Sequence, residues 1–181
     1  MDKAFYQKCI DCEVDNWAGT KHNSWMRRIW FRHFQVESNA VYLVRKFQYH
    51  SSHTGIIHKI QSRFLEIKLM RRYGIFIGRK CTIGLGFRIW HPHGIIINNV
   101  DIGENFNVNQ NCTIGDKEHG YNKIPRIGNN VTMYANSMII GSVKVDDNIV
   151  LGANACLLHD TEGSGIYIGT PARILRRCSS D

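Results

Sequence analysis

The stretch IGNNVTMYANSMIIGSVKVDDNIVLGANACL, residues 127–157, carries an aliphatic or methionine side chain at every sixth position. These positions are Ile127, Met133, Ile139, Val145, Leu151 and Leu157. A period of six matches neither the helical repeat of an amphipathic helix nor the two-residue alternation of a half-buried strand. It indicates a repeat protein in which each hexapeptide forms one short strand and one corner.

The same period extends back to residue 77. Its earlier members are Ile77, Ile83, Ile89 and, after a one-residue slip, Ile96, Ile102, Val108 and Ile114. The segment DKEHGYNKIPR at 116–126 is the long interruption of the repeat. Glycine often follows the aliphatic residue, as at Gly84 and Gly128, and the position four residues after it is small or apolar, as at Ala155.

This pattern predicts a mainly β fold, a parallel β-helix in which three hexapeptides complete one coil. The aliphatic residue of each hexapeptide would point into the prism and stack on its equivalents in neighbouring coils. We expect the following glycine to permit a tight corner, where a larger side chain would be strained.

Residues 1–72 lack the period and predict a helical N-terminal region. Apolar residues recur there at three- and four-residue spacings, with basic residues between them, in the segments 24–34, 39–50 and 56–74. We expect two or three amphipathic helices that cap the first coil and cover its open end.

Local signals place the ends of these helices. Asn23 and Ser24 suit a helix start, Gly74 suits a helix end, and HSSHTG at 50–55 suits a turn. The expected organisation is a helical region at 1–72, a β-helix domain at 73–175 with the loop 116–126, and a tail at 176–181.

The composition is that of a soluble globular protein, with 43% hydrophobic and 21% charged residues. No apolar run approaches the roughly 18 residues that span a bilayer. The N-terminus has acids where a signal peptide would be basic and then apolar, so we expect a cytoplasmic location. Cys9 and Cys12 form a lone CxxC among six scattered cysteines, which favours reduced thiols over a metal site.

Positive charge is concentrated in the N-terminal third. The formal net charge is +8, but residues 21–80 hold 13 Lys and Arg against two acids, a local net charge of +11. This asymmetry is compatible with an anionic membrane face, a phosphate-bearing substrate or a solvated basic surface. No recognised nucleic-acid-binding motif is present, so nucleic acid is the less favoured partner.

The segment RIWHPHGIIINN, residues 88–99, breaks the apolar pattern with two histidines and a proline. Counted along the hexapeptide that begins at Ile89, His91 should point outward and His93 inward, with Pro92 fixing the backbone between them. An outward histidine at a solenoid corner has no packing role. The loop 116–126 would lie beside it and wall a cleft.

These hexapeptides, together with HPHGIIIN, the loop after CTIG and the closing IGTPARIL, resemble the hexapeptide-repeat acyltransferases. The resemblance covers roughly residues 75–175 and is to the serine acetyltransferase branch, especially its shorter relatives of the colanic-acid type. It implies a left-handed parallel β-helix, a homotrimer, and acetyl-CoA bound between adjacent subunits.

The resemblance also implies roles for individual residues. His91 matches the histidine that acts as general base, because attack of a hydroxyl on a thioester needs its proton removed as the bond forms. Gly115, Ala135 and Ala153 match small residues along the pantetheine arm, although solenoid corners favour small residues anyway. Arg173 in GTPARI could meet the 3′-phosphate of the cofactor. No metal is implied.

Departures from the serine acetyltransferase pattern bear on the acceptor. Phe76 stands where those enzymes have the aspartate partner of the base, Trp90 where an aspartate precedes it, and Ile124 where a second histidine lies. His119 is the nearest substitute for that histidine. Tyr134 replaces the usual glycine beside Ala135.

The groups that would bind a serine zwitterion are therefore missing, while Trp90 offers an aromatic face to a sugar ring. The sequence favours acetyl transfer from acetyl-CoA to a hydroxyl of a cell-surface polysaccharide or its precursor, with His91 as base. A serine O-acetyltransferase and a non-catalytic trimeric scaffold remain as alternatives. The basic helical region would receive an anionic or lipid-linked acceptor, or contact the inner membrane face.

Overall fold

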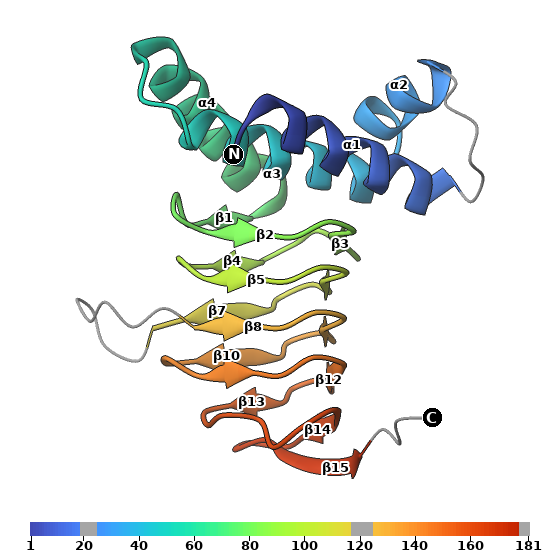
Figure 1. Ribbon diagram of the computed structural model, residues 1–181, viewed down its shortest axis with the longest axis vertical. Coiled ribbons are helices and arrows are strands. Elements are labelled where there is room, and N and C mark those ends of the chain that lie inside the picture. The colour runs from blue at the N-terminus through green and yellow to red at the C-terminus, as the bar shows by residue number, and fades with distance from the viewer. Residues whose placement is uncertain (19–24, 117–124, 178–181) are drawn as a thin grey trace.

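The computed structural model describes residues 1–18, 25–116 and 125–177. Helices cap one end of a tall column of short strands (Figure 1). The helices are α1 (Lys3–Ala18), α2 (Trp25–His33), α3 (Val36–Ser51) and α4 (Ile56–Tyr73). Among the described residues, no helix is both long enough and apolar enough to cross a bilayer.

Three of these helices lie where apolar spacing predicts them, and α1 is an addition. It buries Cys9, Ile10, Glu13 and Val14, a helical spacing in which one member is charged, so the sequence shows no clear apolar stripe. The turn predicted at 50–55 joins α3 to α4. Gly74 ends α4 with φ of 62°, in the left-handed region that glycine tolerates, as the sequence predicts. The helix start expected at Asn23 and Ser24 lies outside the described residues.

Three sheets form the walls of the column. Sheet 1 contains β1 (Phe76–Ile77), β4 (Ile96–Ile97), β7 (Thr113–Gly115), β10 (Met138–Ile140) and β13 (Cys156–Leu157). Sheet 2 contains β2 (Thr82–Ile83), β5 (Asp101–Ile102), β8 (Arg126–Ile127) and β11 (Lys144–Val145). Sheet 3 contains β3 (Arg88–Ile89), β6 (Asn107–Val108), β9 (Thr132–Met133), β12 (Ile149–Leu151), β14 (Gly165–Ile168) and β15 (Arg173–Arg177).

From β1 to β13 successive strands enter successive sheets, so each of these coils contributes one strand to each wall, and β14 and β15 both join sheet 3. Strands of neighbouring coils pair in parallel, and among the described strands only the last pair, β14 with β15, is antiparallel. The front strands in Figure 1 run from left to right while the chain descends, which makes the coil left-handed. The predicted fold class, a left-handed parallel β-helix with an N-terminal helical region, is confirmed.

The core of the column is a stack of inward aliphatic side chains from equivalent strands. In sheet 1, for example, Ile77, Ile97 and Ile114 stand in register and are at most 3% exposed. The preceding inward position is also buried in each coil, as at Cys112 and Ala155. Burial of each such side chain stabilises the fold by about 1.5–3 kcal/mol, so the repeat itself supplies the core.

One position of the predicted register is wrong. Ile97, and not Ile96, points into the column, and the Ile96 side chain is 43% exposed on the outer face of sheet 1. The step from Ile89 to Ile97 therefore spans eight residues, and the next step, to Ile102, spans five. Two additional residues thus lie in the corner that contains His91.

Glycine has a different role from the one predicted. A Cβ on Gly84 would lie 2.7 Å from the carbonyl carbon of Gly103, and one on Gly103 would lie 2.7 Å from the carbonyl oxygen of Gly128. These glycines therefore permit close approach between coils. The corners that need positive φ mostly use asparagine, which tolerates the left-handed region. They lie at Asn105, Asn111, Asn130, Asn136, Asn148 and Asn154.

The helical region replaces the missing coil at the top of the column. Within the column, each coil donates backbone N–H groups to carbonyls of the next, as Gly84 does to Ile102. Carbonyls of the first coil have no coil above them, and side chains of α3 supply the donors. Arg45 donates to the Ile83 and Gly84 carbonyls, and Gln48 donates to the Cys81 carbonyl at 3.1 Å.

Candidate active site

His91 lies at the corner between β3 and β4 with its side chain exposed, as the sequence predicts. Its backbone has φ of 54°, and its carbonyl accepts a hydrogen bond from the His93 N–H at 2.7 Å. Pro92 between them is buried and anchors the corner. No hydrogen bond joins the His91 imidazole to another group in the part of the chain that the structure describes. The imidazole is therefore exposed to solvent, while buried Pro92 and the hydrogen bond from the His93 N–H to the His91 carbonyl hold the backbone of the corner.

The inward position predicted for His93 is wrong. His93 is exposed, and Pro92 and Ile95 take the buried positions around it. The cause is the two-residue lengthening of this corner, which shifts the phase of the hexapeptide after Ile89. The His93 backbone still serves the fold, because its carbonyl accepts the N–H of Asn111 in the next coil at 2.8 Å.

Two of the predicted cofactor residues lie on the same edge of the column as His91. We call this the histidine edge, the set of corners that join sheet 3 to sheet 1. Ala135 follows β9 and is half-buried, and Ala153 follows β12 and is exposed. The corners are joined by backbone hydrogen bonds, such as that from the Asn154 N–H to the Ala135 carbonyl at 3.0 Å. Tyr134, 50% exposed, stands beside Ala135 at the position where the resemblance calls for glycine.

Gly115 lies on another edge. It ends β7, where sheet 1 passes to sheet 2, and we call this row of corners the loop edge. A Cβ on Gly115 would have its nearest neighbour at 3.7 Å, whereas the glycines that face the next coil would clash. Gly115 is buried, and a Cβ there would be in ordinary van der Waals contact with the side chains of Thr113, Ile140 and Asn98.

The loop 116–126 also belongs to the loop edge, between β7 and β8. Its described ends, Asp116 and Pro125–Arg126, are separated from His91 by sheet 1, and residues 117–124, which were expected to wall a cleft beside His91, lie outside the described residues. His119 and Ile124 lie outside the described residues. Which corners share an edge depends on the three-strand coil, and this could not be read from linear spacing.

Arg173 begins β15 at the far end of the column and lines a cavity of about 410 Å³. His159, Asp160, Glu162 and Tyr167 line the same cavity. Oδ1 of Asp160 accepts a hydrogen bond from the backbone N–H of Lys144 at 2.8 Å. Sequence reasoning missed these neighbours, although the end of the six-residue period after Leu157 was an available signal.

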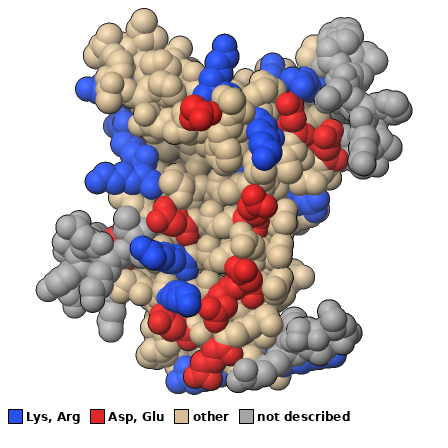
Figure 2. Space-filling view, viewed as in Figure 1, with Lys and Arg blue, Asp and Glu red and all other residues tan. Residues whose placement is uncertain are grey.

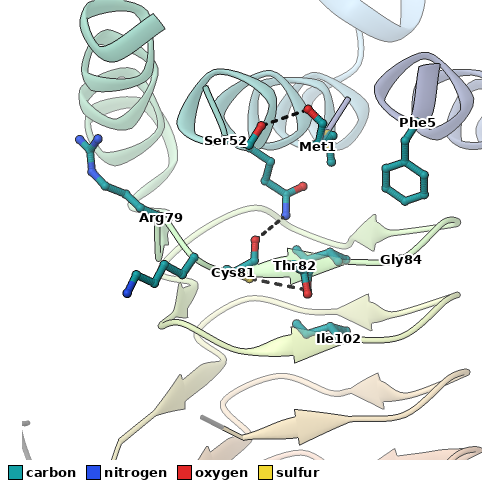
Figure 3. Close-up of a pocket in the computed structure, with 11 residues that line it drawn as sticks. Met1, Phe5, Ser52, Arg79, Cys81, Thr82, Gly84 and Ile102 are labelled. Carbon is teal, nitrogen blue, oxygen red and sulfur yellow. Dashed lines mark hydrogen bonds between the residues drawn. The ribbon is translucent and has the colours of Figure 1, made fainter. Parts of the chain in front are cut away.

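A second cavity of about 450 Å³ lies between the helices and the first coils (Figure 3). Met1, Phe5 and Ser52 come from the helical side, and Arg79 and Lys80 come from the first corner of the column. Neither cavity includes His91.

The buried thiols are structural. Burial raises the pKa of Cys81 to about 12 and also raises the pKa of Cys112, so both stay protonated. Within the described ranges, no group of three or more His, Cys, Asp or Glu side chains is placed to hold a metal ion.

Comparisons with known proteins agree with the resemblance seen in the sequence. The chain is 32% identical over 103 residues to the Escherichia coli protein named "Putative colanic acid biosynthesis acetyltransferase WcaB", covering 56% of this chain and 64% of that one. It is 34% identical over 107 residues to a serine acetyltransferase of Staphylococcus epidermidis, covering 58% of this chain and 50% of that one. The chain thus spans less than two thirds of these relatives. No protein-family model matches.

Solved structures share the fold over nearly the whole chain. The Neisseria gonorrhoeae serine acetyltransferase covers 99% of this chain and 69% of its own, with a TM-score of 0.81 and 19% identity. A serine acetyltransferase in complex with CoA covers 96% of this chain and 71% of its own, with a TM-score of 0.76 and 18% identity. The chain therefore has the hexapeptide-repeat fold of these enzymes, and its sequence is similar to acetyltransferases of two kinds.

Proposed function

We propose that this chain is an acetyl-CoA-dependent O-acetyltransferase that acts in the cytoplasm on a hydroxyl of a cell-surface polysaccharide or its saccharide precursor. The observation that carries this is the His91 corner. This corner is two residues longer than the other corners on the histidine edge. His91 has a positive φ there, and its imidazole is exposed to solvent. A purely structural column would have no use for this departure.

His91 supplies the proton chemistry of the proposed reaction. The neutral imidazole takes the proton of the acceptor hydroxyl as its oxygen attacks the acetyl carbonyl carbon. The carbon–sulfur bond then breaks, and the imidazolium returns the proton to the departing thiolate. The thioester supplies the activated acetyl group, and no covalent enzyme intermediate is needed. Such a base contributes about 10²–10⁴-fold to the rate.

The residues proposed for acetyl-CoA divide between the two edges of sheet 1. Ala135 and Ala153 follow His91 along the histidine edge, and Gly115 lies on the loop edge. One chain cannot bring these edges together, but the histidine edge of one chain can meet the loop edge of a neighbour. The resemblance calls for a small residue at Gly115 beside the pantetheine arm, and a Cβ there would meet no atom closer than 3.7 Å.

The outer face of sheet 1 supports a homotrimer that would form such sites. Its exposed side chains include Ile96 and Met138, and Leu158 follows directly after β13, each at least 40% exposed. The outward positions of sheet 2 carry polar and charged residues instead, as at Asp101 and Arg126. Burying sheet 1 between three copies would remove the apolar face from water and place each His91 beside the next chain's loop edge.

The surroundings of His91 favour a saccharide over serine as the acceptor. Trp90, 38% exposed, adjoins the base, and aromatic faces suit sugar rings. Phe76 starts β1 at the position where the resemblance to serine acetyltransferases calls for a carboxylate. The similarity to a protein named for colanic acid biosynthesis points the same way.

The experiment is CoA release from acetyl-CoA, followed with a thiol reagent, with capsule-type oligosaccharides or with serine. His91→Asn is the informative variant, because asparagine tolerates the positive φ and cannot act as the base. His93→Asn is the matched control at the same corner. We expect saccharide-dependent release that falls about 10²–10⁴-fold in His91→Asn and persists in His93→Asn.

Other results would change the assignment. Release with serine alone would make the chain a serine O-acetyltransferase, which its 34% identity to a serine acetyltransferase keeps as the second candidate. Equal release by wild type and His91→Asn would reject His91 as the base. If acetyl-CoA neither binds nor raises the melting temperature, the chain is a scaffold.

A further inference from the structure

Helix α4 carries apolar side chains on two opposite faces. One face, with Leu65, Leu69 and Tyr73, is buried against the rest of the protein. The opposite face is a stripe of exposed residues, which we call the α4 stripe. It consists of Ile56, Ile57, Ile60, Phe64, Ile67 and Met70. The four most exposed members, Ile56, Ile57, Ile60 and Phe64, are 63–70% exposed.

The spacing explains why these residues form a stripe. At about 100° per residue, Ile56, Ile60, Phe64 and Ile67 fall on one side of the helix, opposite Leu65 and Leu69. Apolar residues scattered singly over a surface need no explanation, but a contiguous exposed stripe of this length marks an interaction surface. The fold has no use for it, because α4 already packs on α3 and the first coil through its other face.

Basic residues flank the α4 stripe on both sides. The same helical geometry puts Lys59 along one flank and Lys68 and Arg72 along the other, while Arg63 and Arg71 fall within the angular span of the stripe. Glu66 is the one acid of α4, and it is engaged by Arg63 at 3.2 Å and by Arg79 at 2.8 Å. In Figure 2, uncharged surface covers the upper left of the molecule, where Figure 1 places α4, with basic side chains at its margin.

The basic residues around the α4 stripe indicate which kind of partner binds it. Two copies of the α4 stripe packed together would bring their basic flanks close to each other, with one acid per helix against five basic residues. An anionic lipid surface accepts both features at once. Its headgroups attract the lysine and arginine flanks, and its acyl boundary receives isoleucine and phenylalanine.

We propose that α4 lies flat on an anionic phospholipid surface, with the α4 stripe inserted at the headgroup boundary and its basic flanks paired with lipid phosphates. The helix does not span the bilayer, and the β-helix projects from the membrane on the far side of α4. This docking is independent of the proposed acetyl transfer. It would hold the histidine edge close to saccharides attached to membrane lipids.

The test uses the full chain and sedimentation with vesicles of phosphatidylcholine alone or with phosphatidylglycerol added. We expect binding to the phosphatidylglycerol vesicles, weakened by added salt, and little binding to phosphatidylcholine alone. Ile60→Ser with Phe64→Ser, and separately Lys68→Glu with Arg72→Glu, should each lower the partition coefficient on the order of tenfold. Leu175→Ser and Lys144→Glu are matched controls at the far end of the column and should bind as wild type does.

Four outcomes would overturn the proposal. They are no binding to either vesicle type, equal binding to both, equal loss in the controls, and a change of oligomeric mass in the Ile60→Ser/Phe64→Ser variant. The last, read by light scattering, would assign the α4 stripe to contact between copies. Because vesicle binding needs no substrate, failure of this proposal is distinct from failure of acetyl transfer.

Discussion

Arg45→Met should destabilise the protein more than a change at any exposed ion pair. The Arg45 and Glu13 side chains are both fully buried, and Nε of Arg45 donates to Oε1 of Glu13 at 2.7 Å. The same guanidinium donates to the Ile83 carbonyl at 2.7 Å and to the Gly84 carbonyl. One side chain therefore joins α1, α3 and the first coil.

The magnitude follows from what the substitution leaves behind. Methionine keeps most of the volume but removes every donor, so Glu13 becomes a buried carboxyl without a cation and two coil carbonyls lose their partners. Burial already raises the pKa of Glu13, and Arg45 opposes that rise. Removing one partner of a buried pair costs about 3–5 kcal/mol. At about 2–4 °C per kcal/mol for a chain of this size, the melting temperature should fall by about 6–20 °C.

Thermal unfolding followed by circular dichroism provides the measurement, with Arg28→Met as the matched control. Arg28 pairs with Asp11 at 2.7 Å, but both side chains are about one third exposed, so its loss should cost about 0–1 kcal/mol. Arg45→Met combined with Glu13→Leu should be less destabilised than Arg45→Met alone, because no charge is stranded. If Arg45→Met and Arg28→Met shift the melting temperature equally, the argument that Arg45 replaces a missing coil fails.

Three further outcomes follow from the structure. Gly128→Ala should lower the free energy of unfolding by about 1–3 kcal/mol, because the added Cβ would lie 2.8 Å from the Asp146 carbonyl carbon. Gly115→Ala, whose Cβ would meet no atom closer than 3.7 Å, should unfold as wild type does but raise the KM for acetyl-CoA. Burial, followed by nearby His58, lowers the pKa of His50, so the free energy of unfolding should fall as pH drops below about 6.5, and His50→Gln should remove part of that dependence in urea titrations. Ile96→Glu should reduce a trimer to single 20.8 kDa chains in light scattering, because it places a charge on the apolar face of sheet 1, and an unchanged mass would reject that interface.

The fold could be predicted because its core residues recur at a fixed interval. Where the prediction was wrong, the local sequence gave no means of choosing. Ile95, Ile96 and Ile97 are consecutive, so composition cannot say which of them faces inward. The structure resolves this through pairing, since Ile97 must align with Ile77 above and Ile114 below. The wrong inward position predicted for His93 has the same cause, because two additional residues in this corner shift which positions after Ile89 face inward.

The candidate site was predictable by residue but not by arrangement. His91, Ala135 and Ala153 share an edge because each follows a strand of sheet 3, and Gly115 stands apart because it follows a strand of sheet 1. The buried pair of Glu13 and Arg45 could not be predicted, because charged residues in helices usually face solvent. The outward α4 stripe was hidden for a related reason. Apolar residues at helical spacing normally predict the buried face, and α4 has two apolar faces.

Between Ile77 and Leu157 the six-residue period has two long departures, the His91 corner before β4 and the loop 116–126 after β7. Both fall on the borders of sheet 1. If three copies pack through sheet 1, each complete site takes His91 from one chain and Gly115 from the next. His91→Asn and Gly115→Leu should each be inactive alone. Denatured together and refolded as mixed trimers, they should recover about a quarter of wild-type activity, because random mixing pairs an intact histidine edge with an intact loop edge at one interface in four. The mass of each trimer, checked by light scattering, controls for lost assembly. If mixed trimers of the correct mass stay inactive, His91 and Gly115 do not meet across the interface, and the cofactor site must be sought within a single chain.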